Sequence, residues 1–190
     1  MKSAFIIFDD MTSLDFIGFY DPITRLKSMK IMQDFEWHIC ATTRHVVDDR
    51  GLHIETEAVN ERLDSYDMLF VPGGFGTRKL QHDRSFIDWL KGAESVPLKV
   101  SVCTGALLLG AAGFLRGRRA TTHPTAYEEL EPYCAEVVRE RVVDEGDIIT
   151  ARGVSSAIDM GLHLAERLAG ADARDRIATQ MDYPYRWTPA

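Results

Sequence analysis

One cysteine lies where a buried strand is expected to meet a helix. Residues 100–102 are apolar and β-rich, and a small-residue helical pattern covers 105–112, so Cys103 is left on the turn between them. Such a turn exposes a nucleophile above a sheet, as it does for the serine of many hydrolases. The positive end of the helix dipole would lower the pKa of this thiol. The alternative is a small buried hydrophobic residue, and spacing alone leaves both interpretations open.

A glycine pair follows a second buried strand. Residues 68–71 are continuously apolar, and Pro72-Gly73-Gly74-Phe75-Gly76 comes directly after them. Paired glycines leave backbone N–H groups approachable, which suits an oxyanion hole or an anion nest. The run matches neither the dinucleotide fingerprint nor the P-loop. Taken by itself, the run is better explained as a tight turn.

An acidic residue follows the first expected strand. Ser13 and Asp15 lie at the start of an amphipathic stretch, and both residue types favour the first positions of a helix. From the residues alone, Asp15 is expected to cap that helix rather than take part in catalysis.

The elements that must position these residues alternate along the chain. Strands are expected at 4–8, 37–42, 68–71 and 100–102, helices at 14–29, 85–93, 105–112 and 156–168, and hairpins within 43–57 and 141–151. Alternation of this kind predicts an α/β three-layer sandwich, with a mostly parallel, flavodoxin-like sheet covered by helices on both faces. Chemistry in such a sheet gathers at the carboxyl ends of the strands.

Composition narrows the class of protein. The 190 residues fit a single domain, 1–190, whose aromatic, proline-rich tail within 171–190 is expected to pack on the body or on a second subunit. A net charge of −7 disfavours nucleic-acid binding, and no apolar run is long enough for a membrane span, so a cytoplasmic protein is expected. The spacing of Cys40, Cys103 and Cys134 suits neither a disulfide framework nor a metal site.

Together these segments resemble the ThiJ/PfpI superfamily, with its class I glutamine-amidotransferase-like fold, over roughly residues 5–168. Within it the chain is similar above all to isocyanide hydratases. The resemblance implies that Cys103 is the nucleophile at the elbow and that Asp15 faces its sulfur, against the capping interpretation. The segments that carry the resemblance are 13–18, 71–74, 101–105, 117–123 and 153–159.

The resemblance also implies the rest of the site. Thr104 would border the pocket beside the nucleophile, and the N–H groups of Gly73 and Gly74 would face it. Gly18 and Phe75 are expected among the substrate-binding residues. A homodimer is implied, and neither a cofactor nor a metal.

Three departures from the superfamily pattern affect the expected chemistry. Thr104 stands where protease-like and glyoxalase-like members commonly have histidine, so a local Cys–His pair is absent and peptide hydrolysis is disfavoured. His123 is the nearest histidine by motif, and we interpret it as a structural, hydrogen-bonded residue. Pro124 and Arg152 replace an aromatic and a small residue, which changes the pocket wall and leaves the substrate open.

The expected activity is hydration of a small electrophile, an isocyanide, to an N-formamide through a thioimidate on Cys103. Asp15 would supply or relay the proton, with its pKa raised by burial and charge repulsion. The alternative function is a redox or electrophile sensor that uses the same cysteine as a stress switch. A third interpretation, a binding module that has lost its chemistry, is disfavoured by the presence of both residues.

Overall fold

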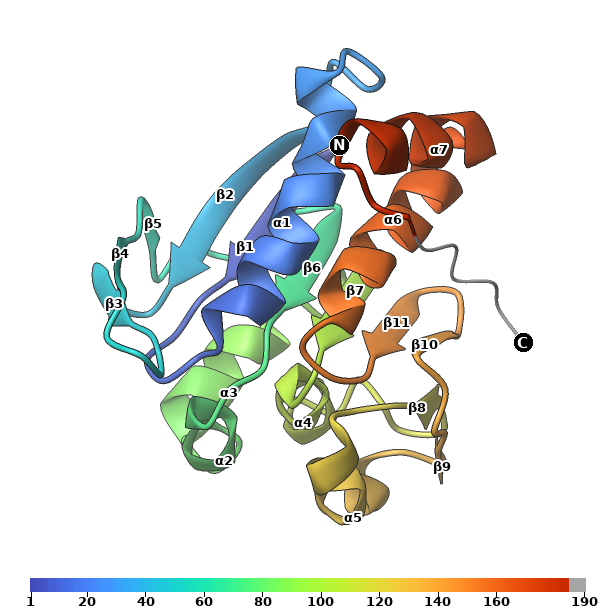
Figure 1. Cartoon of the computed structure of the whole chain (residues 1–190). Helices are drawn as coiled ribbons and strands as arrows, with labels where there is room; N and C mark the ends of the chain where they lie inside the picture. Colours follow the sequence, from blue (N-terminus) through green and yellow to red (C-terminus); the bar gives the residue numbers. More distant parts are fainter. Residues whose placement is uncertain (185–190) are drawn as a thin grey trace.

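A seven-stranded sheet forms the centre of the computed structural model, which describes residues 1–184. All neighbouring pairs are parallel except the last hairpin, which is antiparallel as predicted. The predicted α/β class and mostly parallel sheet are therefore confirmed (Figure 1). In spatial order the strands are β10 (Val142–Asp144), β11 (Ile148–Ala151), β7 (Leu98–Val102), β6 (Met68–Val71), β1 (Lys2–Ile6), β2 (Glu36–Ala41) and β5 (Ala58–Val59).

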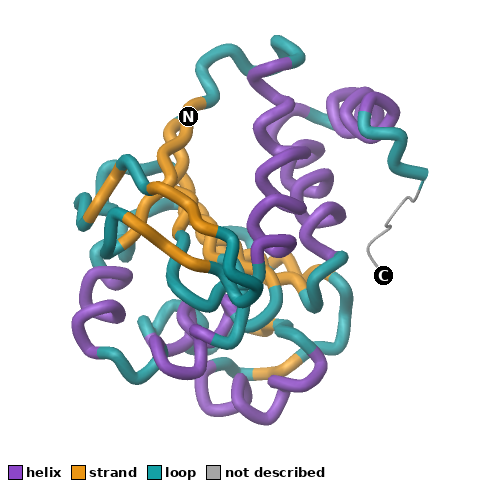
Figure 2. Tube along the Cα trace, turned by 60° about the vertical axis from the view of Figure 1, so that its left-hand side comes forward, coloured by secondary structure: helices purple, strands orange, loops and turns teal. Residues whose placement is uncertain are grey.

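Helices cover both faces of this sheet, as predicted (Figures 1 and 2). The crossover through α1 moves the chain from β1 to β2. The crossovers through α2 and α3 and through α4 move it the opposite way, from β6 to β7 and on to β11, so right-handed connections place these helices on the opposite face. Helices α6 and α7 follow the last strand and pack on the face of α1. The helices are α1 (Ser13–Ser28), α2 (Gly76–Leu80), α3 (Arg84–Lys91), α4 (Gly105–Ala111), α5 (Tyr127–Leu130), α6 (Ser156–Ala169) and α7 (Ala171–Gln180).

Smaller elements surround the carboxyl edge of the sheet. The hairpin predicted within residues 43–57 is present, and a short parallel pair and two turns of 3₁₀ helix were not predicted from the sequence. These elements are β3 (His45–Val47) with β4 (His53–Glu55), β8 (Arg119–Ala120) with β9 (Glu136–Val137), and the 3₁₀ turns Pro124–Ala126 and Glu131–Tyr133.

Aromatic packing fixes α1 on the sheet. The ring of Phe19 stacks on Phe70 of β6 with centroids 4.0 Å apart, and Phe5 of β1 meets Phe19 edge-on at 5.9 Å. All three side chains are fully buried, and aromatic pairs of this kind add to the free energy gained by burial. The first turn of α1 is thereby held against the ends of β1 and β6.

The order of the strands brings three loops together. β1, β6 and β7 are consecutive neighbours and run parallel, so the segments that follow them leave the sheet at the same edge. These segments carry Asp15, the glycine pair at 73–74, and Cys103.

Helix α7 packs on α1 and α6 through buried Ala173 and Ile177, while residues 185–190, with the rest of the predicted aromatic tail, lie outside the described residues. No helix among the described residues is long and apolar enough to cross a membrane.

Candidate active site

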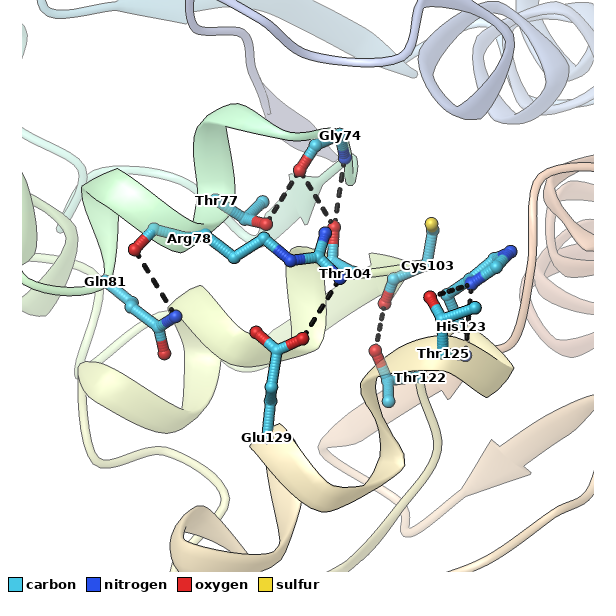
Figure 3. Close-up of polar contacts among 10 residues, drawn as sticks. All are labelled: Gly74, Thr77, Arg78, Gln81, Cys103, Thr104, Thr122, His123, Thr125 and Glu129. Carbon is cyan, nitrogen blue, oxygen red and sulfur yellow. Dashed lines mark hydrogen bonds and ion pairs between the residues drawn. The ribbon is translucent and has the colours of Figure 1, made fainter.

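Cys103 occupies the predicted turn between β7 and α4. Its φ is +57°, a left-handed conformation that is strained for any residue other than glycine and recurs at functional sites. The Cys103 N–H donates to the carbonyl of Ala151 at 3.0 Å, and the Thr122 hydroxyl donates to the Cys103 carbonyl at 2.8 Å (Figure 3). Neighbouring elements therefore hold the strained backbone from both sides, and the side chain is only 6% exposed.

Asp15 lies in the first turn of α1 and is completely buried. Its Oδ2 accepts the N–H of Gly73 at 3.0 Å. Oδ1 has no hydrogen-bond partner in the part of the chain that the structure describes, and the neighbouring Cys103 thiol acts to lower the pKa of the carboxyl group. The capping prediction was wrong for both candidates, because no side chain caps α1 and the Ser13 hydroxyl donates to Asp48 instead, at 2.5 Å.

The two glycine N–H groups are not free to bind an anion, contrary to the expectation from the sequence. Gly73 donates to Asp15, and Gly74 donates to Oγ1 of Thr104 at 3.0 Å. The Thr104 hydroxyl in turn donates to the Gly74 carbonyl at 3.1 Å, so one side chain serves both polar groups of Gly74 (Figure 3). The glycine loop therefore positions Asp15 and Thr104 and is not an open oxyanion hole.

Burial governs the electrostatics of the Asp15–Cys103 pair. Desolvation raises the pKa of Asp15 to about 7, against the opposing contacts with Cys103 and Gly73. Desolvation and the negative charge of Asp15 raise the pKa of Cys103 to about 12. A hydrogen bond from the Thr104 N–H favours the thiolate but does not offset burial, so the predicted lowering of the thiol pKa was wrong. The raised pKa of the carboxyl group agrees with the expectation.

A pocket of about 220 Å³ opens above the cysteine. Phe75 is 75% exposed at this pocket, and the guanidinium of Arg78 lies 5.9 Å from the centre of its ring. The volume is below the roughly 300–1,000 Å³ of drug-sized sites, so the pocket suits a small molecule. Its lining residues are Thr12, Asp49, Arg50, Gly74, Phe75, Arg78, Cys103, Thr104, His123, Thr125 and Val154.

Gly18 lies elsewhere, although it was expected at the substrate site. It is on the face of α1 that packs against α6, where a Cβ would come within 2.9 Å of the Ala157 Cβ. Its small size allows the two helices to approach closely. The structure therefore assigns Gly18 a packing role.

His123 combines a structural bond with a place on the pocket wall. Its Nδ1 accepts the Thr125 N–H at 3.3 Å, so the His123 side chain caps the 3₁₀ turn Pro124–Ala126. The same nitrogen lies 2.8 Å from the Thr125 hydroxyl (Figure 3). Partial burial and the charges of Arg78 and Arg152 lower its pKa, so the ring is neutral at pH 7. The structural interpretation agrees with these contacts, but it did not place the ring beside Cys103 in the pocket.

Other groups offer poorer chemistry. Cys40 is buried beside the Tyr66 hydroxyl, and burial raises the pKa of both Cys40 and the partly exposed Cys134. All three cysteines are free thiols. The described residues contain no group of three or more side chains suited to hold a metal ion.

Several residues of the pocket wall, and one that holds the Cys103 backbone, were missed in the sequence. Arg50 and Asp49 were recognised only as part of a polar hairpin, and Arg78 and Thr122 were not singled out. Arg78 follows the glycine loop by four residues, and Thr122 directly precedes His123. Proximity to these motifs was the available signal, but it does not reveal which way a side chain points.

Comparisons with known proteins agree with this geometry. The DJ-1/PfpI family model matches residues 1–167. Isonitrile hydratase from Pseudomonas putida is 34% identical over 185 residues, which cover 96% of this chain and 78% of that protein.

Two solved structures have the same architecture. A ThiJ/PfpI family protein from Pseudomonas syringae superposes with a TM-score of 0.86 at 27% identity, over 99% of this chain and 77% of that one. Drosophila melanogaster DJ-1beta superposes with a TM-score of 0.82 over 97% of this chain and 98% of that one, and its 23% identity supports the fold alone. Because the family model spans most of the sequence and a relative reaches 34% identity, the chain belongs to the DJ-1/PfpI family.

Proposed function

We propose that this protein hydrates a small isocyanide to the corresponding N-formamide, with Cys103 as nucleophile and Asp15 as proton carrier. The observation that carries the proposal is the buried pair itself: a thiol faces a carboxyl group whose pKa is about 7, at the floor of a small pocket. The similarity to an isonitrile hydratase supports the choice of substrate.

In the first step the sulfur attacks the terminal carbon of the isocyanide. The resting thiol is protonated because its pKa is raised, so the nucleophile forms only as Asp15 takes the proton. The new carboxylic acid then delivers this proton to the attacked carbon. The product is a thioimidate, R–N=CH–S–Cys103, which contains every atom of the thiol and the isocyanide.

In the second step water attacks the thioimidate carbon. Asp15, again a carboxylate, accepts a proton from the water as the C–O bond forms. Asp15 passes this proton to the imidate nitrogen, which gives the tetrahedral adduct R–NH–CH(OH)–S–Cys103. The C–S bond then breaks as the C=O bond forms, and the hydroxyl proton is transferred to the sulfur. The N-formyl amine leaves and the free thiol is restored, so one water is consumed in each cycle.

The sensor function has less support from the same observations. Peroxide oxidises the thiolate, and exposed cysteines with a low pKa react most readily. Cys103 is 6% exposed and its pKa is raised to about 12. A carboxylate that removes the thiol proton during attack suits turnover better than it suits a thiolate that waits for an oxidant.

The test is turnover of a simple aryl isocyanide to its formamide by the wild type and by Cys103→Ala. We expect formamide from the wild type and none above background from the variant. Cys134→Ala is the matched control, because Cys134 lies outside the pocket, and it should turn over like the wild type. A folded wild type that forms no formamide would overturn the proposal.

A further inference from the structure

Two arginines from different elements line the pocket above Cys103. Arg50 belongs to the β3–β4 hairpin and Arg78 to α2, and the pocket wall contains both, together with the sulfur. Arg50 is 73% exposed and Arg78 is 34% exposed, so both guanidinium groups reach water. Neither residue takes part in the proton transfers of the proposed reaction.

Acidic partners orient these arginines without using all their donors. Asp49 contacts Nη1 of Arg50 at 2.8 Å. Figure 3 shows the second contact, between Glu129 of α5 and Nη2 of Arg78 at 3.1 Å. A guanidinium carries five N–H donors in a fork that matches a carboxylate, so one such contact leaves others available. Glu129 is not part of the pocket wall and holds Arg78 from the α5 side.

The residues of the pocket wall have an excess of positive charge. The wall contains two guanidinium groups and one carboxylate, Asp49, whose other oxygen accepts the Thr12 hydroxyl at 2.9 Å. The positive charges of Arg78 and Arg152 act on His123, and its ring is neutral. Asp15 lies beneath the wall, fully buried.

We propose that the substrate carries a carboxylate on a small apolar body, and that Arg50 and Arg78 bind this carboxylate while the electrophilic carbon lies at Cys103. The exposed Phe75 ring beside Arg78 offers the apolar surface that such a body would cover. The pocket of about 220 Å³ limits the body to a small one. This inference rests on the proposed hydration and specifies its substrate class as an isocyano carboxylate.

The test compares two isocyanides that differ in charge and by one methyl group, isocyanoacetate and its methyl ester. The wild type should show a kcat/KM about tenfold higher for the acid, since a charge-assisted hydrogen bond contributes that much. Arg78→Gln and Arg50→Gln should each reduce this acid-to-ester ratio severalfold or more. Arg62→Gln removes an exposed arginine outside the pocket and should preserve the ratio.

A second readout does not depend on hydration. Iodoacetate and iodoacetamide both alkylate a thiol, forming an S–C bond with loss of iodide and transfer of the thiol proton to solvent. The ratio of their rates at Cys103, followed by peptide mass, should fall severalfold in Arg78→Gln relative to the wild type and to Arg62→Gln.

The hydration and alkylation measurements together show whether the hydratase function or the anion site is wrong. If neither isocyanide is hydrated but the alkylation ratio depends on Arg78, the hydratase function is wrong and the anion site stands. If the ester is hydrated as efficiently as the acid, or if both ratios are unchanged in Arg50→Gln and Arg78→Gln, the anion site is wrong.

Discussion

The backbone N–H of Gly73 donates to Oδ2 of Asp15 at 3.0 Å, which joins the loop after β6 to the first turn of α1. A Cβ at position 73 would lie 2.6 Å from the Thr104 nitrogen, 2.7 Å from the Cys103 Cβ and 2.8 Å from Oδ2 of Asp15. Contacts this short do not occur, so Cys103, the Asp15 carboxyl group and the Thr104 backbone meet over a position that requires glycine. The absence of a side chain at Gly73 is thus part of the geometry of the site.

Gly73→Ala should therefore abolish most of the turnover. The added methyl group must displace Asp15, Cys103 or the Thr104 backbone, and a misplacement of about 1 Å at a reacting group costs about 100-fold in rate. Isocyanide turnover per folded molecule measures the effect. Gly113→Ala is the control: its φ of +90° makes the substitution strained, but no atom lies within 4 Å of the new Cβ. That variant should lose stability and keep its rate, whereas an active Gly73→Ala would contradict the geometry.

The pH profile should report the carboxylate form of Asp15. The reactive state needs Asp15 ionised to take the thiol proton, so kcat/KM should rise about tenfold per pH unit below the apparent pKa, near 7, and level off above it. Stopped-time assays between pH 5 and 9 measure the profile, and Asp15→Asn should be slower by about 10²–10⁴-fold and lack the rising limb. A rate that falls as pH increases through 7 would mean that the carboxylic acid is the required form.

The free energy of unfolding should also depend on the ionisation of Asp15, and it should decrease as the pH rises. The pKa of Asp15 is about 7 in the folded protein, against the ordinary 3.8 of an aspartate in the unfolded chain, so between these values the unfolded state loses its proton first. Asp15 therefore lowers the free energy of unfolding as pH rises from about 4 to about 7, by about 1.4 kcal/mol per unit and at most about 4 kcal/mol.

Asp15→Asn removes this charge, so the variant should be more stable than the wild type at pH 8 and approach it at pH 4. Urea unfolding at both pH values measures the difference, and the titration of other groups cancels between the two proteins. A stability difference that does not change with pH would contradict the burial of an ionisable carboxyl group at this position.

The Thr104 hydroxyl should contribute to stability and turnover through its hydrogen bonds with Gly74. Thr104→Val leaves the buried N–H of Gly74 without its acceptor, while the Gly74 carbonyl keeps the Thr77 hydroxyl, and an unsatisfied buried polar group costs about 1–3 kcal/mol. We expect lower stability by thermal unfolding and lower turnover, with Thr104→Ser restoring most of both. Equal behaviour of the valine and serine variants would show that the hydroxyl is not needed.

The fold and the position of Cys103 on a strand-to-helix turn were predictable because they depend on local patterns. The apolar run 68–71 coincides with β6, and the small residues after Cys103 form α4 as expected. Asp15 could not be assigned from its neighbours, since serine and aspartate at a helix start favour a cap, and only the family resemblance indicated its role. The homodimer stays a prediction.

The remaining errors come from tertiary contacts. The glycine N–H groups looked free because their acceptors, Asp15 and Thr104, come from other loops. We predicted a lowered thiol pKa because the sequence indicates a helix that begins after Cys103. The burial of the thiol and the nearby Asp15 carboxyl group, which raise its pKa, depend on tertiary structure and could not be inferred. That the Arg78 side chain lines the pocket could not be predicted for the same reason.

The most direct measurement is the mass of the peptide that carries Cys103 after a rapid acid quench of enzyme mixed with excess isocyanide. Addition through a thioimidate has no leaving group, so we predict a transient mass gain equal to one whole isocyanide on Cys103, slower to form in Asp15→Asn. Formamide produced without this adduct, or by Cys103→Ala at the wild-type rate, would contradict covalent hydration at this site.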